Sequence, residues 1–104
     1  MTTLPENATL AQTQTYIKEL CEHHGWVKGS GLEIFLLFTE EVGELAKAIR
    51  YHEKIQTESG KNQDLEGEFA DVLSYILDLA NHYGVDLDQA LRKKQGANFE
   101  REWK

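Results

Sequence analysis

Cysteine and proline are almost absent from this 104-residue sequence, which contains one of each, Cys21 and Pro5. A single cysteine excludes an intrachain disulfide and is typical of a protein of the reducing cytoplasm. Long apolar runs are also missing, because the longest covers only Ile34 to Phe38 and is far shorter than a membrane span. Residues 1–6 have neither the basic start nor the apolar run of a signal peptide. We therefore expect a soluble cytoplasmic protein that does not bind a membrane.

Basic residues are also fewer than acidic residues. The sequence has 11 Lys and Arg against 18 Asp and Glu, which gives a formal net charge of −7. This balance argues against a surface for nucleic acid polymers. It does not exclude a single nucleotide, because a bound metal ion can invert the local sign of the potential. The length predicts one domain over residues 1–104, with residues 1–8 as a polar N-terminal arm.

Capping signals and apolar periodicity predict four helices and no strand. The spacing of a capping box occurs at Thr9–Gln12, at Ser30–Glu33 and at Asp86–Gln89. The expected helices start at residues 9, 31, 62–64 and 86; the first three end near residues 25, 52 and 82, and a polar loop covers 53–63. The predicted fold class is an all-α antiparallel four-helix bundle that is completed by oligomerisation.

Two carboxylate pairs flank the apolar stripes of the second and third predicted helices. Glu41 and Glu44 form one pair and Glu68 and Asp71 the other, each with the i, i+3 spacing that makes residues neighbours on a helix surface. The stripes themselves comprise Phe38, Val42, Leu45 and Ile49 on one helix, and Leu65, Phe69, Val72, Ile76, Ala80 and Tyr83 on the other. Antiparallel packing would bring four mutually repelling carboxylates together, so the cluster would need a cation. All-oxygen ligands favour Mg²⁺ or Mn²⁺.

The spacing alone also fits a solvated acidic face. Glu19 and Glu22 share it, and we expect that pair to be plain surface. Other site classes lack their residues: no Glu-x-x-His occurs for a ferritin-type di-iron site, and no Walker A loop for a P-loop nucleotide site. Cys21 is expected in the core. His23 and His24 have no i, i+4 partner for a zinc site.

Two further features each leave two interpretations open. Leu87 and Leu91 begin a stripe that continues into basic and polar residues, which either faces an anionic ligand or is a solvated basic helix end favoured by the helix dipole. Gly96 could break this helix and spoil the alignment. Gly43, inside the second helix, is either a tolerated defect or a place where another helix approaches closely.

The order of these motifs resembles a known family. Glu41-Val-Gly-Glu44 followed by Glu68-Phe-Ala-Asp71 resembles the E-x-x-E … E-x-x-D signature of the MazG-like nucleoside triphosphate pyrophosphohydrolases, in the all-α NTP-pyrophosphatase superfamily. Lys94-x-x-x-Asn98-x-x-Arg101 resembles the basic motif of that family. The resemblance covers roughly residues 26–103.

The resemblance implies Mg²⁺-dependent hydrolysis of a nucleoside triphosphate, either a dNTP or a non-canonical NTP, in nucleotide-pool housekeeping. The metal ligands and catalytic residues would be Glu41, Glu44, Glu68 and Asp71, and one of them would orient the attacking water. The substrate-binding residues would be Lys94, Asn98, Arg101 and Trp26. Trp26 would stack on the base, although core packing or an oligomer contact explains it as well. Base and sugar preference are not encoded in these motifs.

Family members are usually dimers or tetramers, so the resemblance also implies a homo-oligomer, with a tetramer favoured over a dimer. The competing hypothesis is a non-catalytic helical interaction or regulatory module with an acidic surface.

Overall fold

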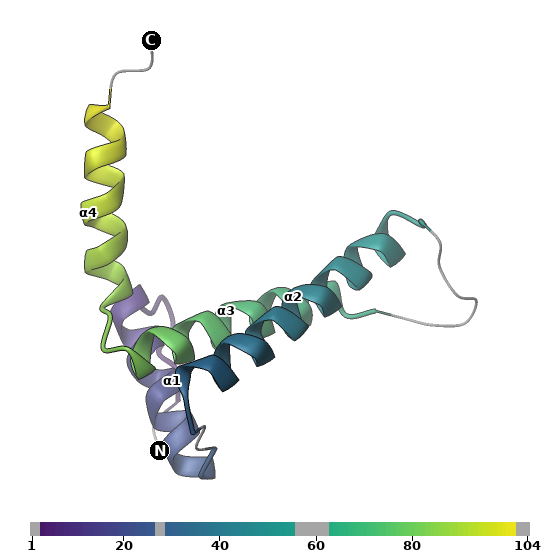
Figure 1. The fold of residues 1–104 in the computed structure, drawn as a ribbon, viewed down its shortest axis with the longest axis horizontal. Helices are drawn as coiled ribbons and strands as arrows, with labels where there is room; N and C mark the ends of the chain where they lie inside the picture. The colour runs from purple at the N-terminus through teal and green to yellow at the C-terminus, as the bar shows by residue number, and fades with distance from the viewer. Residues whose placement is uncertain (1–2, 27–28, 56–62, 102–104) are drawn as a thin grey trace. The chain divides into compact units, whose positions relative to one another are not determined.

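The computed structural model describes residues 3–26, 29–55 and 63–101, and these contain four α-helices (Figure 1). The helices are α1 (Leu10–His24), α2 (Gly31–His52), α3 (Leu65–His82) and α4 (Leu87–Glu100). No strand occurs in the described residues, so the predicted all-α class is confirmed. None of the described helices has the length and apolar character needed to cross a membrane. The chain forms two compact units, one within residues 28–79 and one within residues 1–27 and 80–104.

The first two predicted capping boxes form to different extents. At α1, the Gln12 N–H donates to Thr9 Oγ1 (3.1 Å) and the Thr9 N–H donates to Gln12 Oε1 (2.8 Å), which completes the box. At α2, the Glu33 N–H donates to Ser30 Oγ (3.2 Å), but the Glu33 carboxylate accepts from the Gly29 N–H (2.9 Å). The donor to the Glu33 side chain is therefore the N–H of Gly29, one residue before the Ser30 N–H that a complete capping box would use.

Glycine and aspartate mark the other helix ends. Gly25 after α1 and Gly84 after α3 have φ values of 68° and 67°, the left-handed conformation that commonly terminates helices. Asp86 Oδ1 accepts from the Gln89 N–H (3.0 Å) and starts α4. This helix continues through Gly96, so the break considered from the sequence does not occur.

In the unit within residues 28–79, α2 and α3 run antiparallel along each other (Figure 1). Ile34, Ala48 and Leu77 are its most buried side chains. The stripe predicted for α2 is only partly buried, because Val42 and Ile49 remain 41% and 43% exposed. One partner helix covers a narrower band than the apolar residues of α2 provide. Val42 and Ile49 are therefore not part of the buried core within this chain.

In the other unit, the buried side chain of Gln14 hydrogen-bonds α1 to the turn between α3 and α4. The Gln14 Nε2 donates to the Val85 carbonyl (2.6 Å), and the Leu87 N–H donates to Gln14 Oε1 (3.0 Å). The Asn81 Nδ2 also donates to the Gln14 carbonyl (3.0 Å). The side-chain amide of Gln14 thus satisfies two backbone groups that helix hydrogen bonding leaves without partners.

Candidate functional site

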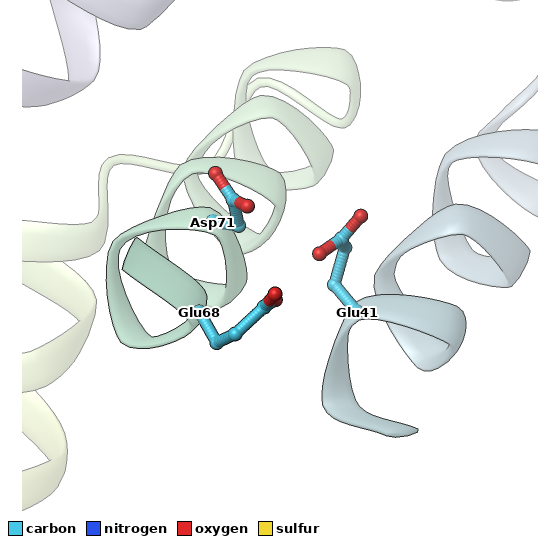
Figure 2. A group of neighbouring side chains, drawn as sticks. All are labelled: Glu41, Glu68 and Asp71. Atoms are coloured by element: carbon cyan, nitrogen blue, oxygen red, sulfur yellow. The ribbon is translucent and has the colours of Figure 1, made fainter. Parts of the chain in front are cut away.

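The acidic cluster receives one carboxylate from α2. Ile34, Glu41 and Ala48 follow one another at intervals of seven residues, so they lie on one side of the helix. Ile34 and Ala48 are buried, whereas Glu41 is half-buried. The face that packs on α3 therefore carries a carboxylate between its two most buried side chains, and Figure 2 shows Glu41 pointing toward α3.

The start of α3 supplies two more carboxylates. Asp64 Oδ1 caps the helix by accepting from the Gly67 N–H (3.0 Å); the alternative cap, Asn62, lies outside the described residues. A Cβ at position 67 would run into the Asp64 carboxylate, so glycine leaves room for the cap. Glu68 and Asp71 follow one turn apart, on the same side of α3.

The three side chains converge across the two helices. One carboxylate oxygen each of Glu41, Glu68 and Asp71 lies within 4.8 Å of the other two (Figure 2). Glu41 and Glu68 are half-buried and Asp71 is exposed. Glu68 Oε2 is closed off from solvent and has no hydrogen-bond partner among the described residues. A buried carboxylate oxygen without a donor costs free energy, so this atom favours a cation beside it.

The electrostatics of the cluster point the same way. Partial burial raises the pKa of Glu41 above its ordinary value of 4.5, and the nearby charges of Asp71 and Glu68 raise it further. Both causes disfavour the charged form of Glu41. A divalent cation would reverse the second effect by replacing repulsion with attraction.

The donor set fits a hard divalent cation. Exposed carboxylates often lie close together without an ion, so proximity alone would not be sufficient. Here the buried oxygen of Glu68 and the raised pKa of Glu41 indicate that the cluster is strained without a positive charge. Carboxylate oxygens are the ligands that Mg²⁺, Mn²⁺ and Ca²⁺ prefer.

Glu44, the fourth predicted ligand, lies outside this group of three. Its side chain is exposed on α2, yet its charge contributes to the raised pKa of Glu41, so the two carboxylates are close enough to interact. The neighbouring Gly43 has open space around it, since a Cβ added there would meet nothing within 4 Å. No described part of the chain therefore explains the glycine by close approach.

The predicted phosphate-binding residues belong to the other unit. Lys94 is exposed and Asn98 half-buried, both on α4. Arg101 is the C-cap residue of α4 (φ −68°, ψ 129°), and its N–H donates to the Asn98 carbonyl (3.3 Å). The predicted orientation of these residues toward the carboxylates stays a prediction.

Trp26, the predicted base-stacking residue, is 52% exposed, so it is not a core residue. Its indole stacks on the His24 imidazole, with ring centroids 4.4 Å apart and planes inclined by 17°. The sequence did not single out this partner. The available signal was the order His24-Gly25-Trp26, because a left-handed glycine turns the chain back and brings its two neighbours together.

Comparison with known proteins finds relatives over most of the chain. The family model of the MazG nucleotide pyrophosphohydrolase domain matches residues 30–95. An uncharacterized protein of Bacillus subtilis (strain 168), YvdC, is 34% identical over 95 residues, which are 83% of this chain and 89% of YvdC. A dATP/dGTP diphosphohydrolase of cyanophage S-2L is 39% identical over 64 residues, which are 62% of this chain and 50% of the phage protein.

A solved structure agrees in fold. YPJD from Bacillus subtilis, named as a candidate pyrophosphatase, superposes with a TM-score of 0.74 at 25% sequence identity. The superposition covers 90% of this chain and 96% of YPJD. The region matched by the family model includes all four predicted ligands and Lys94, whereas Trp26, Asn98 and Arg101 lie outside it.

Proposed function

Because the chain belongs to the MazG nucleotide pyrophosphohydrolase family, we propose that it hydrolyses a nucleoside triphosphate to the monophosphate and pyrophosphate with Mg²⁺ as cofactor. The observation that carries this proposal is the convergence of Glu41, Glu68 and Asp71, together with a buried Glu68 oxygen that has no hydrogen-bond partner among the described residues. The reaction would serve nucleotide-pool housekeeping in the cytoplasm.

The residues proposed to hold the metal are Glu41, Glu68 and Asp71, with Glu44 as a fourth ligand. A bound divalent ion lowers the pKa of its water and neutralises charge that develops on the phosphates. Mn²⁺ would satisfy the same oxygen donors. One of these carboxylates also orients the water that attacks the α-phosphorus, since a carboxylate is a strong hydrogen-bond acceptor.

The triphosphate brings about four negative charges to a protein whose net charge is −7, so cationic side chains are required. Lys94 and Arg101 are proposed to bind phosphate oxygens, Arg101 in bidentate fashion. Asn98, which can both donate and accept, is proposed to contact a phosphate or the sugar. The exposed indole of Trp26 is proposed to stack on the base.

The proposed substrate class is a dNTP or a non-canonical NTP. The cyanophage relative is named for dATP and dGTP, which supports a deoxynucleotide. That match covers half of the phage protein, and it supports the substrate class and not the role of any single residue.

A screen of pyrophosphate release across canonical and damaged NTPs and dNTPs tests this function. We expect equimolar pyrophosphate and monophosphate with Mg²⁺ or Mn²⁺, and neither product in the presence of a chelator. The variant Asp71→Asn should be inactive under the same conditions. Release of inorganic phosphate with a diphosphate product, or no hydrolysis of any triphosphate at millimolar Mg²⁺, would refute the proposal.

We also propose that the chain forms a homo-oligomer, a tetramer in preference to a dimer. The support is the amount of apolar surface on α2 and α3, where large hydrophobic side chains remain 41–64% exposed: Leu32, Phe35, Leu36, Val42, Ile49, Phe69 and Leu73. Apolar residues exposed on this scale mark interaction surfaces. Sedimentation that finds only an 11.9 kDa species at micromolar concentration would contradict the proposal. The variant Leu36→Glu should dissociate the oligomer.

A further inference from the structure

The turn that ends α1 fixes the backbone of Trp26. Gly25 adopts a left-handed conformation (φ 68°), and its N–H donates to the Glu22 carbonyl (3.2 Å). The Trp26 N–H donates to the Cys21 carbonyl (2.9 Å). These two bonds form a Schellman motif, in which the residue after the glycine is hydrogen-bonded back to the last helical turn. The backbone that carries the indole is therefore hydrogen-bonded to the last turn of α1.

The side chain of Trp26 is held as well. His24 covers one side of the indole in a nearly parallel stack, at 4.4 Å between centroids and 17° between planes. His23 lies edge-on to His24, at 5.1 Å and 79°, and so limits the rotation of the imidazole. The indole still exposes 52% of its surface. One face of a large planar ring is thus supported by the protein, while much of the ring remains accessible.

A supported, accessible indole has the properties of a stacking platform. Stacking on an aromatic side chain is a general way of binding nucleobases, because every base has a π-face. An unsupported tryptophan would lose rotamer freedom when a base stacks on it, and this loss weakens binding. A ring that already occupies its bound orientation avoids that loss.

We propose that His24 is a positioning residue, which holds Trp26 in the orientation that stacks on the base of the nucleotide substrate. This inference rests on the proposed function for the identity of the ligand. His24 itself touches neither substrate nor metal in this assignment. Its contribution is to base binding, and it leaves the hydrolytic step unchanged.

Steady-state pyrophosphate release from dATP tests this role by separating binding from turnover. His24→Ala should raise KM about 2- to 13-fold, the range expected for one aromatic pair, with kcat unchanged. Trp26→Ala should raise KM about 5- to 150-fold, as for the loss of one base–aromatic stack. His24→Phe keeps a planar ring on the indole and should restore a KM close to that of the unaltered protein. His52→Ala is the matched control, because His52 is also an exposed histidine in a last helical turn.

Fluorescence provides a readout that does not depend on hydrolysis. Trp103→Phe leaves Trp26 as the one tryptophan of a sequence that has two. Titration of this variant with dAMP, without metal, should quench the Trp26 emission. Adding His24→Ala should raise the dAMP concentration at half-quenching by the same 2- to 13-fold, and His24→Phe should reverse that shift.

Three results would overturn the inference: equal KM values for His24→Ala and His52→Ala, a His24→Ala defect in kcat alone, or Trp26 emission that changes with protein concentration and is unaffected by dAMP. The last result would identify Trp26 as an oligomer contact. If pyrophosphate is released while His24→Ala has no effect, the inference fails and the proposed function stands. If no triphosphate is hydrolysed but dAMP quenches Trp26 in a His24-dependent way, the proposed function fails and the stacking platform stands.

Discussion

Replacing Glu41 by glutamine separates the metal-binding role of the acidic cluster from its role in the fold. The substitution keeps the shape of the side chain and removes one of three converging charges. Without metal, the variant should be slightly more stable at neutral pH, because the folded protein raises the pKa of Glu41 above 4.5. Because this pKa is raised, the negative charge of Glu41 disfavours folding. The destabilisation is absent below about pH 4.5, grows as pH rises, and is complete above the folded-state pKa. Since solvent screens this half-buried group, the gain should be about 1 kcal/mol or less.

With metal, the expected effect is larger and of opposite sign. Mg²⁺ at about 100 times its dissociation constant stabilises a one-site protein by about 2.7 kcal/mol. For a domain of about 100 residues, that corresponds to a rise in Tm of about 13 °C. The unaltered protein should show this rise, and Glu41→Gln should lose most of it. Pyrophosphate release should fall by at least about 100-fold, because even residues behind metal ligands are worth about 10- to 100-fold.

The assay is thermal denaturation with and without Mg²⁺, beside pyrophosphate release and calorimetric titration with Mg²⁺. Glu40→Gln is the matched control, since Glu40 is an exposed glutamate that precedes Glu41 on α2. It removes the same charge and should keep the Mg²⁺-dependent rise in Tm. A Glu41→Gln variant with ordinary turnover and an ordinary Mg²⁺ response would refute the metal assignment. Equal losses in both variants would show that net charge, and not ligation, is responsible.

Three other substitutions test separate parts of the molecule. Arg101→Ala should weaken nucleotide binding by about 1–3 kcal/mol in calorimetry without weakening Mg²⁺ binding, and truncation after Gln95 should abolish turnover while the acidic site still binds Mg²⁺. If the truncated protein hydrolyses triphosphates normally, the basic motif is only a solvated tail. Gly43→Ala should stabilise the protein by about 1 kcal/mol in urea denaturation, because a Cβ there meets nothing within 4 Å. If the variant oligomer dissociates in sedimentation, a second chain approaches Gly43. Gln14→Ala should destabilise by about 2–4 kcal/mol in the same denaturation assay, since it leaves two backbone groups unpaired, and a loss below 1 kcal/mol would mean that water replaces the amide.

The approach of Glu41, Glu68 and Asp71 was predictable from helical periodicity combined with antiparallel packing of two helices. Glu68 and Asp71 are one turn apart on α3, and Glu41 lies on the side of α2 that carries Ile34. Antiparallel packing then suffices to bring three carboxylates together. The same arithmetic rotates Glu44 about 60° away from Glu41, so a single packed face cannot present both equally. Its place as a fourth ligand came from the resemblance and stays a prediction.

The features that the sequence did not reveal depend on backbone that is not helical or on contacts between distant residues. Gln14 reads as a surface residue of an amphipathic helix, and only the carbonyl of Val85, 71 positions away, explains its burial. His24 and Trp26 lie two positions apart, where side chains of a continuous helix would diverge. They stack because the left-handed Gly25 ends the helix between them. Helical periodicity cannot predict a contact that forms only where the helix ends.

The C-terminal basic motif also lies at a helix end. Lys94 and Asn98 are helical, so their directions follow from the rotation of α4. Arg101 is the C-cap residue, and its φ of −68° is close to the helical value, so its Cα–Cβ bond still follows the rotation of α4. The stripe therefore predicts the direction of both Cα–Cβ bonds, whereas the chemistry of the two cations differs. If Arg101 binds a phosphate in bidentate fashion, Arg101→Lys should cost nearly as much nucleotide affinity as Arg101→Ala, because lysine offers a point charge without the planar fork. Lys94→Arg, by contrast, should be tolerated. Equal tolerance of the exchange at both positions would show that the motif supplies charge alone.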